Sequence, residues 1–137
     1  MPVNPELLGR AFPATAPIEV TAASVHAFAT AVLASDPDAS IAPPTYPIVV
    51  QQAALDELLA DPSTGIVLSR VVHGEQRFAT TRDIVIGDVL TGELTVTAMR
   101  ALGPATMLTA ETVVRDAAGE QVATATSVLV IGEEDAA

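Results

Sequence analysis

The sequence predicts an α+β fold in which an antiparallel sheet wraps around one long central helix. After Gly65 the apolar residues recur with a period of two, which is typical of strands. The preceding segment, residues 48–60, is apolar almost all round, which is typical of a helix buried on most sides. The turns between the later strands are short, and turns this short join antiparallel neighbours.

The first part of the chain predicts one edge strand and one amphipathic helix. Residues 12–20 have strand character, but Pro13 and Pro17 cannot donate to a ladder and therefore place this strand at a sheet edge. Thr21 is a suitable N-cap residue, and apolar residues at helical spacing follow it to about Leu33. A short amphipathic helix is expected there.

The central helix is expected over residues 44–60. Prolines are concentrated before it, and proline is tolerated in the first turn of a helix. A turn-forming segment, residues 61–65, ends it. Its few polar residues are Gln51, Gln52, Asp56 and Glu57.

Four long strands complete the predicted fold, with one edge left unpaired. Exposed strand edges are commonly protected by association, so we expect the protein to form dimers. A sheet of this kind wrapped around a helix is a hot-dog fold, and we assign residues 1–131 to one such domain and residues 132–137 to a flexible acidic tail. The strands are expected at residues 67–80, 88–100, 106–116 and 121–131.

Composition excludes several classes of function. The net charge is -11 with no lysine, which opposes binding to nucleic acid. There is no cysteine and there are only two histidines, His26 and His73, so we expect neither a metal site nor a cofactor. No apolar run is long enough for a membrane span and the N-terminus does not resemble a signal peptide, which predicts a cytoplasmic protein without membrane insertion.

One strand, residues 70–80, carries an unusual number of polar groups. Because side chains alternate along a strand, His73, Glu75 and Arg77 are expected to share one face. Gly74 within the strand indicates a bulge or a close backbone approach. A solvated edge strand without a site explains the same pattern, so both interpretations stay open.

Three blocks of the sequence resemble a known family. Residues 4–9 with 12–20, residues 43–50 and residues 70–78 are similar to MaoC-like (R)-specific enoyl-thioester hydratases and (3R)-hydroxyacyl-thioester dehydratases of actinobacteria. The third block resembles the non-catalytic N-terminal half of double hot-dog hydratases. The resemblance implies a hot-dog fold and an acyl-thioester ligand.

The family's catalytic loop is altered in this chain. Catalytic members carry Gly-Asp-x-Asn-Pro-x-His, whose Asp and His activate the water that adds to or leaves the acyl β-carbon. Asp36 falls on the motif's Asp and Asp38 on its Asn, but Ser40 or Ile41 stands where the His belongs. Hydration needs an acid or base matched to the working pH, so we expect no catalytic residue here.

The resemblance therefore implies a non-catalytic, acyl-binding subunit of a heteromeric (3R)-hydroxyacyl-thioester dehydratase, a lyase of fatty acid or polyketide biosynthesis. A partner hot-dog chain would supply the Asp/His pair, and acyl carrier protein or coenzyme A would carry the substrate. The residues expected to contact the substrate are Thr45, Tyr46, Ile48, Val49, His73 and Gly74.

Two alternatives remain open. The chain could be an active homodimeric dehydratase or hydratase that uses His73 with Glu75 or Asp36. It could also be an acyl-binding or assembly protein without enzymatic activity. A neighbouring reading frame that encodes a hot-dog chain with an intact Asp/His loop would favour the heteromer.

Overall fold

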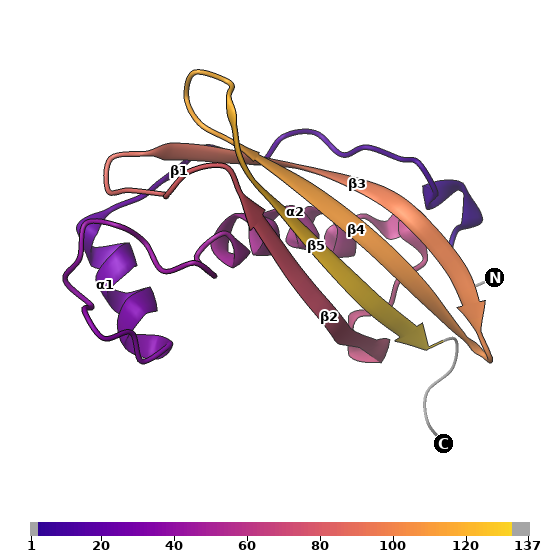
Figure 1. The fold of residues 1–137 in the computed structure, drawn as a ribbon. Coiled ribbons are helices and arrows are strands. Elements are labelled where there is room, and N and C mark those ends of the chain that lie inside the picture. The colour runs from indigo at the N-terminus through magenta and orange to yellow at the C-terminus, as the bar shows by residue number, and fades with distance from the viewer. Residues whose placement is uncertain (1–2, 133–137) are drawn as a thin grey trace.

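One five-stranded antiparallel sheet dominates the computed structural model, which describes residues 3–132 (Figure 1). The strand order is β1-β3-β4-β5-β2, and every neighbouring pair is antiparallel. This architecture confirms the predicted α+β hot-dog fold. The strands are β1 (Ile18–Glu19), β2 (Val71–Thr80), β3 (Val89–Leu102), β4 (Ala105–Arg115) and β5 (Gln121–Gly132).

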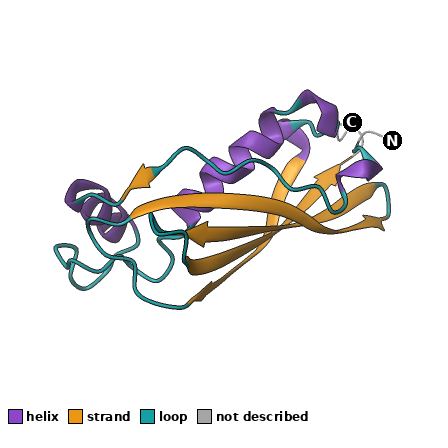
Figure 2. Cartoon of the chain, turned by 90° about the horizontal axis from the view of Figure 1, so that it is seen from above, coloured by secondary structure: helices purple, strands orange, loops and turns teal. Residues whose placement is uncertain are grey.

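Two α-helices accompany the sheet: α1 (Ala22–Ala31) and α2 (Ile48–Ala60). Figure 2 shows α2 lying along one face of the curled sheet, while α1 lies near one end. Thr21 caps α1 as predicted, because its hydroxyl accepts a hydrogen bond from the Ser24 backbone N–H. Three short 3-10 turns complete the described elements: Pro5–Leu7, Pro62–Thr64 and Leu68–Arg70.

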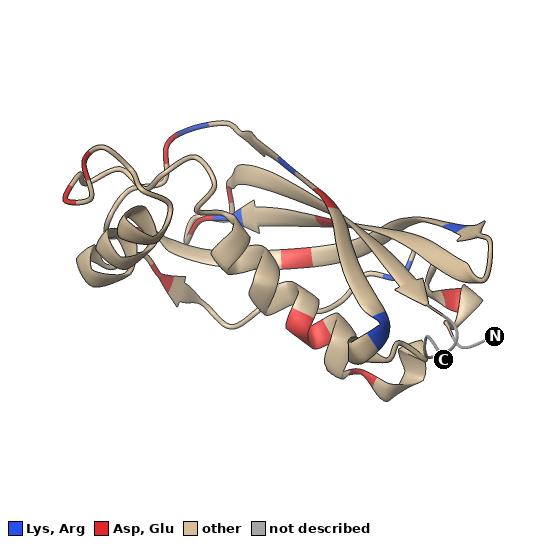
Figure 3. Cartoon of the chain, turned by 90° about the horizontal axis from the view of Figure 1, so that it is seen from below, with Lys and Arg blue, Asp and Glu red and all other residues tan. Residues whose placement is uncertain are grey.

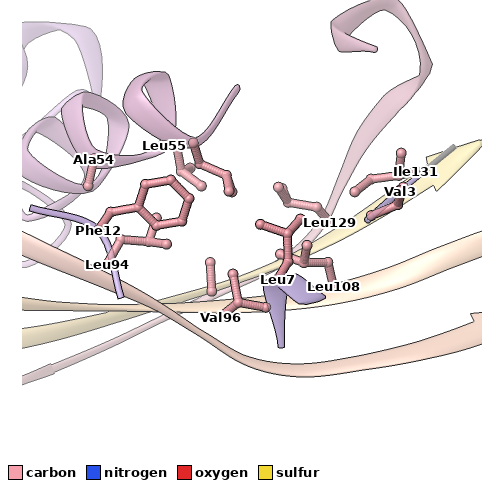
Figure 4. Packing of buried hydrophobic residues seen from close by; sticks show 12 residues of the cluster. Val3, Leu7, Phe12, Ala54, Leu55, Leu94, Val96, Leu108, Leu129 and Ile131 are labelled. Atoms are coloured by element: carbon pink, nitrogen blue, oxygen red, sulfur yellow. The ribbon is translucent and has the colours of Figure 1, made fainter. Parts of the chain in front are cut away.

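The core lies between α2 and the inner face of the sheet. Phe12 packs beside Leu55 of α2 and Leu94 of β3 (Figure 4). The helix approaches β3 so closely that a Cβ at Gly92 would lie 2.7 Å from Val50 Cγ1. Glycine at this position therefore allows the contact between helix and sheet.

The first strand and the start of α2 are shorter than predicted, and proline explains both differences. Only Ile18–Glu19 pairs continuously with β3, because Pro13 and Pro17 interrupt the preceding segment. The earlier part of the segment still lies along β3: the backbone N–H groups of Phe12 and Thr15 donate to the carbonyls of Leu94 and Gly92 at 2.8 and 2.9 Å, and Ala11 forms an isolated bridge to Thr95. The helix begins at Ile48 rather than at residue 44, after a turn that ends at Pro47.

A β-bulge in β2 corrects the predicted arrangement of its faces. His73 pairs with Leu129 and Glu75 pairs with Val128, so Gly74 is the extra residue. The insertion shifts the alternation by one residue, and the His73 ring bonds to the side chain of Gln76. His73 therefore lies with Gln76, while Glu75 pairs with Arg77 at 3.9 Å on the other face.

The predicted acidic tail starts at Gly132, which ends β5, and its remaining residues lie outside the described part of the chain. Within residues 3–132, no helix is long and apolar enough to cross a membrane.

Candidate functional site

A largely apolar groove opens between α1, the first half of α2 and strand β2. Its volume is about 500 Å³, which lies within the range of small-molecule sites. Acidic residues of α2 occur only in the second half of the helix, so the half that borders the groove is uncharged (Figure 3). The groove is lined by Phe28, Val32, Thr45, Ile48, Gln52, His73, Gln76 and Phe78.

The polar wall of the groove is connected to the core. Gln76 Nε2 donates to Gln51 Oε1, and Gln51 Nε2 donates to the Ala125 carbonyl at 2.9 Å. The hydroxyl of Ser127 donates to Gln76 Oε1, and His73 Nε2 lies 2.9 Å from the same oxygen. Gln51 and Ser127 are fully buried, so this network joins α2, β5 and β2 beneath the groove.

The structure places three of the predicted substrate contacts around this groove: Thr45, Ile48 and His73. Val49 is half-buried and packs beside the core, outside the groove lining. Gly74 occupies the bulge of β2 next to His73. Their role as ligand contacts stays a prediction.

Tyr46 lies behind the groove rather than in its wall. Its side chain is fully buried, its ring meets Phe28 edge-on with centroids 5.4 Å apart, and its hydroxyl lies 2.8 Å from Ser24 Oγ. The hydroxyl is therefore already satisfied within the protein. Tyr46 supports Phe28, which itself lines the groove.

The three catalytic candidates, Asp36, His73 and Glu75, do not meet. Asp36 lies in the loop between α1 and α2, where its carboxylate accepts the Asp38 backbone N–H at 3.1 Å. Glu75 lies on the face of β2 that is opposite His73. Among the described residues, no hydrogen bond or ion pair joins any two of these three side chains.

Among the described residues one Asp/His contact is present, but neither of its side chains lines the groove. His26 Nδ1 lies 2.9 Å from Asp38 Oδ1, and the two side chains are 55% and 83% exposed. A proton-transfer pair works best in a partly enclosed site beside its substrate. This exposed pair instead links α1 to the loop that follows it.

Sequence reasoning missed part of the groove. Phe28 and Val32 are among the apolar residues at helical spacing after Thr21, and nothing local indicates that they border a groove. The sequence does contain a signal for the polar network. Gln51 lies within an apolar helix and is fully buried, and a buried amide requires a hydrogen-bond partner. Within residues 3–132, no group of three His, Cys, Asp or Glu side chains could hold a metal ion.

Known proteins are similar in sequence to this chain over most of its length. The family described as "FAS1-like, dehydratase domain region" matches residues 6–125. A UPF0336 protein of Leifsonia xyli subsp. xyli is 48% identical over 148 aligned positions, which cover 98% of this chain and 99% of that protein.

Solved structures share the fold at low sequence identity. The C-terminally truncated HadBC complex of Mycobacterium tuberculosis, a (3R)-hydroxyacyl-ACP dehydratase, superposes with a TM-score of 0.75 and 22% identity, over 90% of this chain and 96% of that chain. A MaoC-like dehydratase superposes with a TM-score of 0.79 and 22% identity, over 93% of this chain but 43% of that longer chain.

Proposed function

This chain belongs to the family of the FAS1-like dehydratase domain region, and from that premise we propose that it is the acyl-binding, non-catalytic subunit of a heteromeric (3R)-hydroxyacyl-thioester dehydratase. A partner hot-dog chain supplies the catalytic Asp/His pair. The apolar groove of this chain receives part of the acyl ligand, and the partner holds the reacting carbons.

The single observation that carries the proposal is the state of the loop between α1 and α2. Its Asp36 carboxylate stabilises a turn through the Asp38 backbone, and the loop contains no histidine. Dehydration needs a group that removes a proton and one that assists departure of the hydroxyl. A lone exposed carboxylate in a turn supplies neither function.

The groove has the properties that binding of an acyl chain requires. Its exposed surface is mainly apolar, with Thr45 and Gln52 as polar residues on the α2 side and His73 and Gln76 on the β2 side. Burial of an alkyl chain in such a groove contributes about 0.8 kcal/mol per methylene. A volume of about 500 Å³ leaves room for a medium-length acyl chain.

The free edge of β2 supports association with a second chain. It is the outer strand of the sheet, and Val72 on it is 63% exposed. Leu68, just before the strand, is 67% exposed. Strand addition at this edge would cover both side chains and the unpaired backbone groups. The similar HadBC protein is described as a complex, which agrees with a hot-dog partner.

The homodimeric alternative has less support. It pairs His73 with Glu75 or Asp36, yet the bulge at Gly74 places His73 and Glu75 on opposite faces of β2. A homodimer would therefore need His73 of one copy to meet Glu75 or Asp36 of the other copy across the interface between them. If the chain is instead an assembly protein, it should bind its partner, and substitutions in the groove should not change the KM or the rate of the complex.

The proposal is tested by co-expression with the hot-dog chain of a neighbouring reading frame that retains the Asp/His loop. We expect a stable complex that turns over enoyl thioesters of acyl carrier protein or coenzyme A. His73→Gln in this chain should keep most of the maximal rate and weaken substrate binding. Removal of the partner's histidine should lower the rate by about 100- to 10,000-fold, as loss of a general base does.

Two outcomes would contradict the proposal. One is a loss of rate of that size from His73→Gln in an intact complex, which would make β2 part of the active site. The other is an unchanged KM for every acyl chain length after Ile48→Asp, because Ile48 lines the groove.

A further inference from the structure

A chain of two amides runs from the buried Gln51 through the half-buried Gln76 to the exposed His73, and it has a fixed direction. It begins at the carbonyl of Ala125, which can only accept a hydrogen bond. Gln51 must therefore turn its NH₂ group toward this carbonyl and its oxygen toward Gln76. Gln76 must then turn its own NH₂ group toward Gln51, which leaves Gln76 Oε1 as an acceptor.

A second, longer and exposed contact agrees with this orientation but does not hold the amide by itself. Gln76 Nε2 also donates to the backbone carbonyl of Arg77, at 3.3 Å. Gln76 Oε1 thus faces Ser127 and His73, and both must donate to it. The bond from Gln51 to Ala125 is buried and the bonds from Gln51 and Ser127 to Gln76 are part-buried, so water does not readily replace these partners, whereas the bond from His73 to Gln76 is exposed.

From this polarity we infer that His73 is held as the Nε2–H tautomer and is the specificity-determining acceptor of the groove, accepting through Nδ1 a hydrogen bond from a hydroxyl or amide N–H of the ligand. The choice of ligand rests on the proposed acyl-binding function, whereas the tautomer does not.

The surroundings of Nδ1 agree with this assignment. The His73 side chain lines the groove, and Nδ1 has no hydrogen-bond partner among the described residues. The other groove residues offer alkyl or aromatic groups, apart from Thr45, Gln52 and Gln76. Gln76 is occupied in the network, and Gln52 donates through Nε2 to Asp56, so Gln52 Oε1 and the Thr45 hydroxyl are the other acceptors in the lining. A ligand donor that enters beside His73 therefore meets an unoccupied acceptor.

Two sources can provide the donor. One is a hydroxyl on the acyl chain, and the other is an amide N–H of the pantetheine arm that carries it. Both would bond to the same imidazole nitrogen. A ligand that lacks a donor gains only apolar contact in the groove.

The chain contains its own control for the tautomer. His26 meets the Asp38 carboxylate through Nδ1, and an ionised carboxylate can only accept. The two histidines of the sequence should therefore have opposite tautomers: Nδ1–H for His26 and Nε2–H for His73. Long-range ¹H–¹⁵N spectra of the purified chain at about pH 9, where imidazoles are neutral, distinguish the two.

Neighbouring glutamines on α2 give a matched pair of variants. Gln51→Leu removes the anchor at Ala125, so the Gln76 amide can turn and the His73 spectrum should show a mixture of tautomers. Gln52→Leu removes a groove-lining amide outside the network and should leave His73 as Nε2–H. An Nδ1–H tautomer at His73 in the unaltered chain would overturn the inference, whether or not Gln51→Leu folds.

Three probes test the ligand: methyl octanoate, methyl 3-hydroxyoctanoate and octanoyl-pantetheine. Each should move the Ile48 methyl resonances, which report on occupancy of the groove. Methyl octanoate should leave His73 Nδ1 unchanged, whereas a shift of Nδ1 with the hydroxy ester or with octanoyl-pantetheine identifies the source of the donor. Occupancy by all three without any Nδ1 shift would overturn the ligand assignment, and failure of all three to move Ile48 would overturn the acyl-binding function while leaving the tautomer intact.

Discussion

Gly92→Ala should destabilise the fold because it closes the space between α2 and β3. A Cβ built at this position would lie 2.7 Å from Val50 Cγ1 and 3.0 Å from Thr112 Cγ2. Both neighbours are fully buried, so neither side chain can move toward solvent. Overpacking of this kind costs about 1–3 kcal/mol. In a chain of this length, each kcal/mol lowers Tm by roughly 3–4 °C.

A second strand glycine provides the control. A Cβ at Gly74 would meet its nearest atom at 3.5 Å, and Gly74 lacks the positive φ that would strain alanine. Gly74→Ala should therefore change Tm by less than about 2 °C, within the range of a surface substitution. Thermal and urea denaturation of the two variants measure the difference. Equal stability of Gly92→Ala and the unaltered protein would refute the close packing of α2 on β3.

Three further substitutions test other parts of the fold by urea denaturation. Thr112→Val should stabilise by about 1 kcal/mol, because the buried Thr112 hydroxyl has no partner among the described residues; a loss of stability would show that the hydroxyl is bonded. Leu33 has φ 59° and is 90% exposed, so Leu33→Gly should stabilise by about 0.5–1 kcal/mol through relief of left-handed strain; lower stability would indicate a packing role. Hydrogen bonding from Arg82 holds the pKa of Asp88 below its ordinary 3.8, so the stability from this pair is complete above that pH and is lost as the pH falls through the lowered pKa. Asp88→Asn should weaken this acid-side dependence, and an unchanged slope would contradict it.

The sequence predicted the fold well where periodicity carries the information. The long strands and the central helix follow from the spacing of apolar residues, which directly reflects burial on one face. The prediction was less accurate at residues 12–20 and 44–47. There the missing N–H of proline shortened the first strand and the central helix. The ends of helices and strands depend on which hydrogen-bond partner each backbone N–H and C=O group has in the folded chain.

The site was less predictable because it depends on two tertiary details. Gly74 indicated a bulge or a close approach, but only the pairing with β5 shows that the bulge separates His73 from Glu75. The groove also needs α1 beside β2, and no local pattern specifies that contact. Tyr46 illustrates the consequence, since its position in the sequence suggested the cavity wall while packing against Phe28 buries it.

The central claim is that this chain binds the acyl ligand and a partner performs the chemistry. Turnover of enoyl thioesters should be measured for the purified chain alone, for the hot-dog partner alone and for the two combined. We expect negligible turnover by this chain and full activity only in the complex. Robust turnover by the isolated chain, abolished by Asp36→Asn or His73→Ala, would contradict it.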